Sequence, residues 1–211
     1  MKRVLRAIAQ RAKRLKPKKA DSALMLIGLQ NPGAGYQGTR HNIGAEAVRV
    51  LARKIGADFR SGPRGIPVQV ADGSCGDVRV RLAIPTTFMN ESGRAVGPLI
   101  RYFEPGRLLV AHDDIDLAFG KMRVHDSRGS GGHNGVRSIV DSLGSQAFWR
   151  LRIGVGRPPG SEDPADYVLK RFDDPVEAEI LAREAADVLE AFATGGEESA
   201  RQVAGHRGTE S

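Results

Sequence analysis

Apolar residues in the central part of the chain are spaced with the periods of strands and of helices. Residues 24–29 form a continuous apolar run, which is typical of a buried strand. Residues 78–84 alternate apolar and polar side chains, as a half-buried strand does. Two further strands are predicted at residues 108–111 and 151–155.

Other segments place their apolar residues on one face of a helix, and these predicted helices are 48–55, 96–103, 136–143 and 176–192. Asn90 has the residue type and the position to cap the second of them. Asp174 followed by Pro175 is a typical start for the last helix, and Gly195-Gly196 is expected to end it. The predicted inner face of this helix consists of Val176, Ile180, Leu181, Val188, Leu189 and Phe192.

Strands that alternate with helices predict an α/β fold, with a twisted, mostly parallel or mixed central sheet and helices on both faces. A single domain is expected to cover residues 22–196. Residues 1–21 form an N-terminal extension that we expect to be flexible, and residues 197–211 a polar tail. In such folds ligands bind in the crevice at the carboxyl ends of the strands.

The composition is that of a soluble globular protein, with 40% hydrophobic and 27% charged residues in a chain of 211. No apolar run approaches the ~20 residues that span a bilayer. The single cysteine, Cys75, excludes an internal disulfide and a zinc site built from several thiolates. Its neighbours are Gly, Asp and Ser, so we expect an exposed or half-buried turn thiol without a catalytic role.

The positive charge of the chain is concentrated at its N-terminus. Nine of the 32 Lys and Arg residues lie in residues 1–20, which contain no acid. The rest of the chain has 23 basic and 25 acidic residues, a formal net charge of −2. Nucleic-acid binding would therefore use this arm together with a local basic patch. The alternatives for the arm are a solvated tail, an amphipathic helix on an anionic surface and an organelle-targeting segment.

Polar side chains follow the predicted strands at their carboxyl ends. Asn31 comes after the first strand, Asn90 after the strand that ends near residue 84, and Asp113 after residues 108–111. Asp113 is a plausible partner for His41, because a carboxylate on one imidazole nitrogen would fix the tautomer and let the ring act as a base. The competing bases, which spacing alone does not exclude, are His112, His125 and His133.

Asn31, Asn90 and Asn134 each lie beside a glycine or a helix start. Asn is common at such positions for turn and cap geometry alone. Together, their amides could instead hold a substrate carbonyl or a developing oxyanion. Phe88 and Met89 would form an apolar wall for a peptide or a base, and core packing explains that pair equally well.

A basic cluster in the second half of the chain has two interpretations. Its members could be exposed charges on strand faces, or they could hold phosphates, which Arg pairs in bidentate fashion. The cluster consists of Lys121, Arg123, Arg128, Arg150 and Arg152.

The order of these motifs resembles the bacterial-type peptidyl-tRNA hydrolase family from about residue 24 to residue 172. The matching segments are 27–33, Tyr36, 39–42, 85–90, 111–113, 131–135 and 150–154. Gln30 departs from the family pattern, in which Gly or Ala is common, and the basic arm lies outside the family core. Ordered motifs are together far more specific than any one of them.

The resemblance implies hydrolysis of the ester between a nascent peptide and tRNA, without a metal or cofactor. His41 would be the base that activates water, and Asp113 would hold it in its basic form. Asn31 would sense the blocked amino end of the peptide. The residues implied to bind peptide, water or tRNA are Tyr36, Phe88, Met89, Asn90, Lys121, Arg123, His133, Asn134 and Arg152.

We further expect a monomer in the cytoplasm whose partner is peptidyl-tRNA, with organellar targeting by residues 1–20 as the alternative location. The competing function is a catalytically silent RNA-binding adaptor with the same fold. The presence of His41, Asp113 and all three Asn residues favours catalysis.

Overall fold

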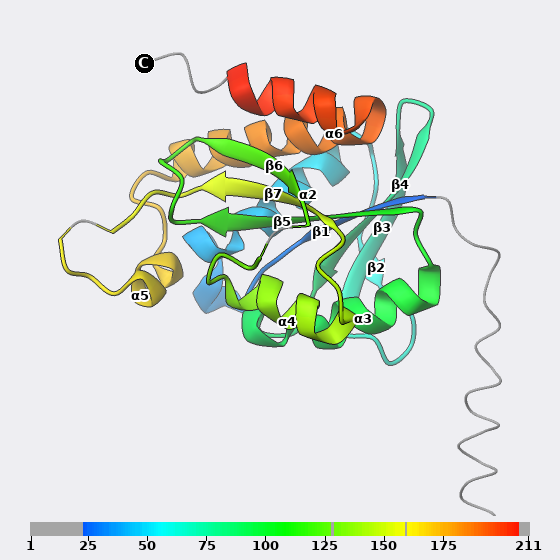
Figure 1. The fold of residues 1–211 in the computed structure, drawn as a ribbon, viewed down its shortest axis with the longest axis horizontal. Helices are drawn as coiled ribbons and strands as arrows, with labels where there is room; N and C mark the ends of the chain where they lie inside the picture. The colour runs from blue at the N-terminus through cyan, green and yellow to red at the C-terminus, as the bar shows by residue number, and fades with distance from the viewer. Residues whose placement is uncertain (1–22, 128, 159, 207–211) are drawn as a thin grey trace, which may run out of the picture.

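The computed structural model describes residues 23–127, 129–158 and 160–206. In this part of the chain a seven-stranded sheet lies between two layers of helices (Figure 1). The expected extension, residues 1–21, lies outside the described residues, as do residues 207–211. The strands are β1 (Leu24–Gly28), β2 (Arg60–Ser61), β3 (Val68–Cys75), β4 (Val78–Pro85), β5 (Arg107–Asp114), β6 (Met122–Asp126) and β7 (Trp149–Gly154).

The order of these strands across the sheet is β2-β3-β4-β1-β5-β7-β6. Neighbours among the central strands β4, β1, β5 and β7 run parallel, whereas β2, β3 and β6 pair in antiparallel fashion towards the edges. The predicted α/β class and mixed sheet are therefore confirmed. Because β1, β4 and β5 are parallel, they end at the same edge of the sheet, where the polar motifs follow them.

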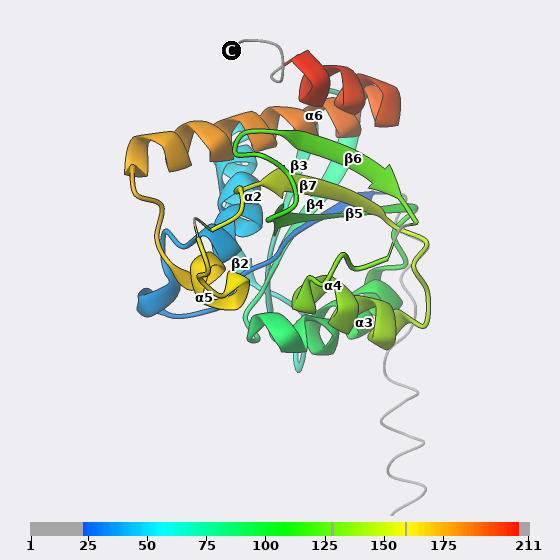
Figure 2. The same ribbon diagram turned by 60° about the vertical axis from the view of Figure 1, so that its left-hand side comes forward.

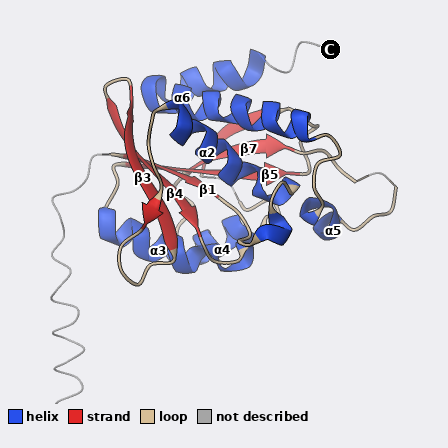
Figure 3. Cartoon of the chain, turned by 180° about the vertical axis from the view of Figure 1, so that it is seen from behind, coloured by secondary structure: helices blue, strands red, loops and turns tan. Residues whose placement is uncertain are grey.

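Helices cover both faces of the sheet, as predicted (Figure 2). They are α2 (Ile43–Lys54), α3 (Ser92–Phe103), α4 (Asn134–Leu143), α5 (Pro164–Leu169) and α6 (Pro175–His206). α2 packs with α6 on one face, α3 packs with α4 on the other, and a separate apolar core fills each layer. α5 stands beyond the carboxyl ends of β5 and β7 (Figures 1 and 3). Short 3₁₀ turns lie in the loops: η1 (Ala34–Tyr36), η2 (Arg40–Asn42) and η3 (Met89–Glu91).

Two glycines let the start of α2 approach the sheet closely. A Cβ at Gly44 would lie 2.2 Å from the carbonyl oxygen of Ala111, and one at Gly28 would lie 2.4 Å from that of Gly44. The backbones of β1, β5 and α2 are therefore in direct contact. This contact places η2, the turn that precedes α2, against the end of β5.

The hairpin formed by β3 and β4 is not predicted by the sequence pattern. Residues 72–75 have the composition of a turn but continue β3, and the turn comes at Gly76 with φ +54°. Asp72 is accommodated in the strand because it pairs with Arg60 and Arg81 on the neighbouring strands. Cys75 is therefore buried and not a turn thiol, and burial raises the pKa of its thiol to about 11.

The last helix continues beyond its predicted end. Gly196 has φ +73° and kinks α6, but the helix resumes and runs to residue 206. Residues 197–206 are therefore helical, which corrects the expected polar tail. The continuation is stabilised because Ala200 and Ala204 are buried against the core.

The start of α6 agrees with the prediction in its cap and differs in its inner face. The Asp174 carboxylate accepts a hydrogen bond from the Val176 N–H at 2.7 Å. The side chains of Val176 and Ile180 are exposed, however, because α6 begins before it reaches the core. Among the described helices, none is both long and apolar enough to cross a membrane.

Candidate active site

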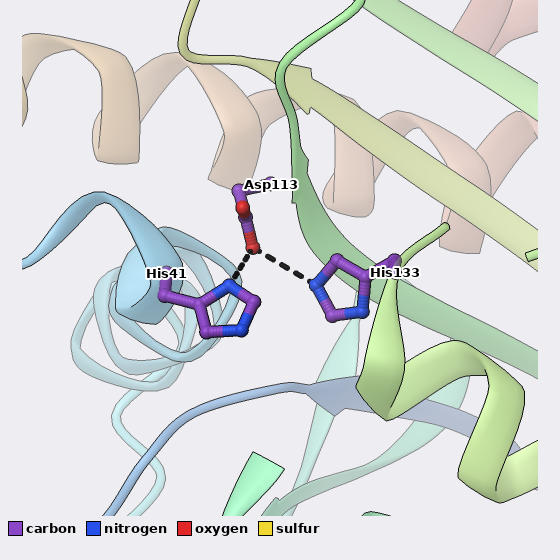
Figure 4. Close-up of side chains that lie close together, drawn as sticks. All are labelled: His41, Asp113 and His133. Atoms are coloured by element: carbon purple, nitrogen blue, oxygen red, sulfur yellow. Dashed lines mark hydrogen bonds and ion pairs between the residues drawn. The ribbon is translucent and has the colours of Figure 1, made fainter. Parts of the chain in front are cut away.

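His41 and Asp113 meet at the carboxyl edge of the sheet (Figure 4). His41 lies in η2, directly before α2, and Asp113 lies near the end of β5. Nδ1 of His41 is 2.8 Å from Oδ1 of Asp113, and both side chains are largely buried. The contact expected from the sequence is thus present, and the two residues are 72 positions apart in the chain.

His133 also contacts Asp113, which the sequence does not predict. Its Nε2 lies 2.9 Å from the same carboxylate oxygen, Oδ1 (Figure 4). On the other side of the ring, Nδ1 accepts hydrogen bonds from the N–H groups of Gly135 and Val136, at 3.1 and 3.3 Å. Both ring nitrogens are therefore engaged within the protein. Its contacts within the protein thus stand beside the expected role in substrate binding, since His133 also lines the hollow next to His41.

Asp113 is ionised in this environment. Burial by itself disfavours the carboxylate, but the neighbouring rings of His41 and His133 lower its pKa well below the usual range. An ionised carboxylate can only accept hydrogen bonds, so both imidazoles must donate to it. His41 donates from Nδ1, which leaves a lone pair on Nε2. That nitrogen lies on the side of the ring turned away from Asp113 (Figure 4).

The other predicted bases are placed elsewhere. Nδ1 of His112 lies 2.7 Å from the carbonyl oxygen of Asp113, and burial together with the nearby His133 ring lowers the pKa of His112 to about 3. His125 lies in β6, where its register partner is Arg150. Neither histidine lines the hollow that contains His41.

His41 lines a cleft of about 480 Å³, which we call the His41 cleft. Its walls come from the ends of β1 and β5, from η3, from the start of α4 and from α5. The predicted site residues that line it are Asn31, His41, Met89, Asn90, Asp113, His133 and Asn134. A neighbouring hollow of about 680 Å³ also reaches Asn31 but contains neither His41 nor Asp113. The chemistry therefore assigns the site to the His41 cleft.

Asn31 lies three residues after the end of β1 and is held by three hydrogen bonds. The side chain of Asn42 bonds its backbone N–H and its backbone C=O, at 2.8 and 3.0 Å. Oδ1 of Asn31 accepts from the Met89 N–H at 2.8 Å. This bond fixes the amide orientation and leaves Nδ2, for which the described residues supply no acceptor, as a donor at the cleft. Sequence reasoning missed the structural role of Asn42, although its position next to His41 is a signal.

Tyr36 and Phe88 lie outside the lining of the His41 cleft. Their rings pack edge to face with centroids 6.3 Å apart, and Phe88 is 52% exposed. Met89, the next residue, is buried in the core between the sheet and α3 and α4 and also lines the cleft. Met89 therefore belongs to the core and also borders the cleft, whereas the exposed ring of Phe88 belongs to neither.

Asn90 does not cap α3, contrary to the prediction. It lies in the middle of η3 with an exposed side chain, and the hydroxyl of Ser92 closes that turn by donating to the Met89 carbonyl at 2.7 Å. Asn134 is the first residue of α4 and is also exposed. Its Oδ1 accepts a hydrogen bond from Arg137, which orients the amide nitrogen away from that guanidinium.

The sequence patterns predict neither α5 nor its link to the turn that carries His41. The backbone N–H of Arg40 donates to the Lys170 carbonyl at 3.1 Å, and its guanidinium donates to the Arg171 carbonyl. The same guanidinium stacks over the ring of Tyr167 at 4.2 Å. Arg40 thereby fixes one wall of the cleft beside the histidine. An Asp-Pro pair starts α5 just as one starts α6, and this signal could have revealed the helix.

Arg150 departs from its predicted place on an exposed strand face. Its side chain is buried and stacks over the ring of Phe148 at 4.2 Å. Burial lowers the pKa of this guanidinium, and the nearby Asp126 opposes that effect. Arg150 is therefore part of the interior of the protein.

Two other basic residues share a face of the sheet. Arg123 and Arg152 are register partners on β6 and β7, so their side chains project to the same side. Arg152 also pairs with Asp114 through Nε. Lys121 precedes β6 and is exposed, and Arg128 lies outside the described residues.

Among the described residues, one group has its possible ligand atoms close enough together to hold a metal ion. It consists of His41, Asp113 and His133. A neutral His133 that binds a metal through Nε2 would carry its proton on Nδ1. Nδ1 already accepts hydrogen bonds from two N–H groups of α4. In the metal-binding tautomer Nδ1 would carry a proton and could accept neither of these bonds. The arrangement of His133 fits a hydrogen bond to the carboxylate better than metal coordination.

An imidazole base oriented by a buried carboxylate, in a cleft with amide donors, has the chemistry needed to activate water. The fold and the site together define a hydrolytic enzyme of the α/β class.

Comparison with known proteins narrows this class. The sequence profile of a family described as Peptidyl-tRNA hydrolase matches residues 25–210. The chain is 44% identical over 182 residues to a peptidyl-tRNA hydrolase of Mycobacterium tuberculosis, covering 84% of this chain and 95% of that protein. A Mycobacterium avium relative of the same name is 43% identical over 171 residues, with 79% and 89% covered. The chain belongs to the peptidyl-tRNA hydrolase family.

A solved structure supports the same assignment. The crystal structure of peptidyl-tRNA hydrolase from Acinetobacter baumannii is similar to this one with a TM-score of 0.77 and 32% sequence identity. The match covers 89% of this chain and 96% of that chain. The similarity therefore extends over the whole catalytic fold.

Proposed function

We propose that this protein hydrolyses the ester bond between peptide and tRNA in peptidyl-tRNA, with His41 as the general base and Asp113 as the residue that orients it. The observation that carries the proposal is the 2.8 Å contact between Nδ1 of His41 and the buried, ionised carboxylate of Asp113, which turns Nε2 away from that carboxylate. Membership of a family named for this activity supplies the substrate.

The proposed reaction uses water as the nucleophile. His41 Nε2 takes a proton from water as the water oxygen attacks the ester carbonyl carbon, and Asp113 stabilises the imidazolium that forms. The bond between that carbon and the ribose oxygen then breaks, and His41 returns the proton to the ribose oxygen. The products are a peptide with a free carboxylate and an uncharged tRNA.

Asn31 is proposed to separate peptidyl-tRNA from aminoacyl-tRNA. The Met89 N–H occupies Oδ1 of Asn31, so that Nδ2 is the group offered to the substrate. A blocked amino group carries a carbonyl oxygen that can accept this bond, whereas the free ammonium of aminoacyl-tRNA has only donors. A site built to hydrogen-bond one substrate rejects an analogue that leaves its polar group without a partner.

Asn90 and Asn134 are proposed to position the peptide and the attacking water. They stand on different walls of the His41 cleft, Asn90 on η3 and Asn134 on α4. Arg137 holds Oδ1 of Asn134, so its amide N–H groups can donate to charge that develops on the carbonyl oxygen. The proposed apolar wall for the peptide consists of Tyr36, Phe88 and Met89.

The tRNA backbone is proposed to lie along β6 and β7. Arg123 and Arg152 project from one face of this strand pair, and Lys121 directly precedes it. Asp114, which pairs with Arg152, itself lines the His41 cleft, so this face adjoins the cleft. The basic arm would add phosphate contacts whose strength depends on salt. We further propose that the enzyme acts as a monomer in the cytoplasm, without a metal.

Hydrolysis of N-acetyl-aminoacyl-tRNA tests this function, with unblocked aminoacyl-tRNA as the matched substrate control. Wild type is expected to release the acetylated amino acid and to spare the unblocked substrate, and His41→Ala is expected to release neither. Circular dichroism confirms that the variant is folded. Tight binding of tRNA without any cleavage by the wild type would contradict the enzyme and support a silent RNA-binding adaptor.

A further inference from the structure

His133 occupies the cap position of α4 and caps the helix with its ring. Its Nδ1 accepts from the N–H groups of Gly135 and Val136, and its side chain is 7% exposed. A nitrogen that accepts two N–H groups must carry a lone pair and no proton. Imidazole is not among the side chains that usually cap helices. This use of the ring therefore calls for an explanation beyond helix stability.

The second nitrogen of the ring explains this use. Nε2 lies 2.9 Å from Oδ1 of Asp113, a carboxylate that can only accept. His133 therefore carries its proton on Nε2 and is fixed as one neutral tautomer. Protonation of Nδ1 would break both helix contacts and would add a positive charge at the positive end of the α4 dipole.

We infer that His133 is a positioning residue: its Nε2–H donates to the Asp113 carboxylate, ties it to the start of α4 and thereby sets the orientation of His41. The geometry stands independently of the reaction, whereas its consequence for turnover rests on the proposed function.

The shared acceptor atom gives this link its effect on catalysis. Both His41 and His133 donate to Oδ1 of Asp113, so that the oxygen divides its charge between a reacting ring and a fixed one. If the fixed donor is removed, more of the carboxylate charge acts on His41, which favours its imidazolium form. The other titratable groups around the carboxylate and the two rings are His112 and Asp114 on β5 and Asp163 at the start of α5.

Two variants test the contacts of the two ring nitrogens of His133 separately. In His133→Asn, the shorter side chain keeps an acceptor for the α4 N–H groups but does not reach Asp113. In His133→Gln, the amide reaches the position of Nε2 and can donate to Asp113, but the cap is lost. The readouts are the thermal midpoint, the profile of kcat/KM against pH, and the protonation of each ring nitrogen in ¹⁵N-histidine-labelled enzyme by long-range ¹H–¹⁵N NMR.

We expect the wild-type His133 to carry its proton on Nε2 and none on Nδ1 at the pH of the assay. His133→Asn should keep a midpoint near that of the wild type, while the acid limb of its profile moves to higher pH and kcat/KM on that limb falls about tenfold. His133→Gln should be less stable and should keep the wild-type limb. A merely structural role would instead give the Asn variant a wild-type pH profile, which would overturn the inference.

The NMR measurement does not depend on turnover, so the two proposals fail separately. Predicted ring protonation in a protein that cleaves no peptidyl-tRNA would contradict the proposed function alone. Hydrolysis by an enzyme whose His133 carries a proton on Nδ1 would contradict the positioning role alone.

Discussion

Asn42 bonds the backbone of Asn31 with both ends of its side-chain amide. Its Oδ1 accepts from the Asn31 N–H at 2.8 Å, and its Nδ2 donates to the Asn31 carbonyl at 3.0 Å. Because Asn42 directly follows His41, one side chain sets the position of the proposed base relative to the amide proposed to read the substrate. Catalysis and discrimination are therefore coupled through a residue that performs neither.

Replacing Asn42 with Ala is expected to disturb both activities. The change leaves a buried N–H and a buried C=O of Asn31 without partners, at a cost of about 1–3 kcal/mol each. The free energy of unfolding should fall by about 2–4 kcal/mol and kcat/KM by about tenfold or more. Urea denaturation and N-acetyl-aminoacyl-tRNA hydrolysis measure these effects. Asn42→Asp, which keeps the acceptor alone, should be intermediate, and unfolding of the Ala variant at the wild-type urea concentration would contradict the role.

Loss of the base and loss of its partner should differ in severity. His41→Ala is expected to lower kcat by on the order of 10²–10⁴-fold, because no other histidine in the described chain presents a free nitrogen to the cleft. Asp113→Ala should also lower the rate, since His41 would lose the acceptor that fixes its tautomer. Single-turnover kinetics separates these effects from tRNA binding, which should stay intact in both variants. A fully active Asp113→Ala variant would contradict the orienting role.

Discrimination should depend on the amide nitrogen of Asn31. Asn31→Asp keeps an oxygen for the Met89 N–H but replaces the donor with a negative charge that attracts an ammonium group. The ratio of kcat/KM for blocked over unblocked substrate is therefore expected to fall by about tenfold or more. Paired assays on acetylated and free aminoacyl-tRNA measure it. A ratio that stays at the wild-type value would show that another group reads the amino end.

The parts of the fold that follow from sequence are those in which burial dictates the pattern. β1 is apolar along its length because helices cover both faces of the central sheet, and the helical stripes of α2 and α4 face one core each. The full length of β3 could not be predicted from the sequence, because Asp72 is accommodated in the strand by ion pairs with two arginines on neighbouring strands. Such pairing depends on residues distant in sequence and leaves no local signal.

In the site, too, one contact could be predicted from the sequence and others could not. The contact between His41 and Asp113 could be predicted because Asp113 lies at the end of one strand, and the polar loop that carries His41 follows another strand that ends at the same edge of the sheet. The contact of His133 with that carboxylate could not, because it depends on the angle at which α4 begins and on a ring that serves as a cap. The burial of Arg150 likewise reflects the stacking of one strand residue on Phe148.

Acid should destabilise the protein in a range set by His112. Burial, with His133 nearby, lowers the pKa of His112 from 6.5 to about 3, so the unfolded chain binds a proton that the folded chain excludes. Its contribution to stability is thus complete above about pH 6.5 and is lost as the pH falls towards 3, at about 1.4 kcal/mol per pH unit. His112→Asn should reduce this slope in urea denaturation between pH 6 and pH 4. An unchanged slope would mean that other groups cause the loss of stability. Asp113 does not contribute in this pH range, because its pKa is lowered and its ionisation affects stability only below its ordinary pKa.

The basic arm should affect binding and leave chemistry unchanged. Nine of the 32 Lys and Arg residues lie in residues 1–20, so deleting this segment removes cations that can displace counterions from tRNA. We expect tRNA affinity to weaken at low salt and the slope of log K against log salt to become shallower. kcat on a short esterified substrate should stay within about twofold of the wild type, since the His41 cleft is built from residues after the arm.

Filter binding across a salt series measures the slope. The matched single-charge control is the chain that keeps the arm and carries Arg123→Gln, for which we expect the slope to change by about one. An arm deletion with the wild-type slope would exclude phosphate contacts by the arm and would leave β6 and β7 as the tRNA-binding surface.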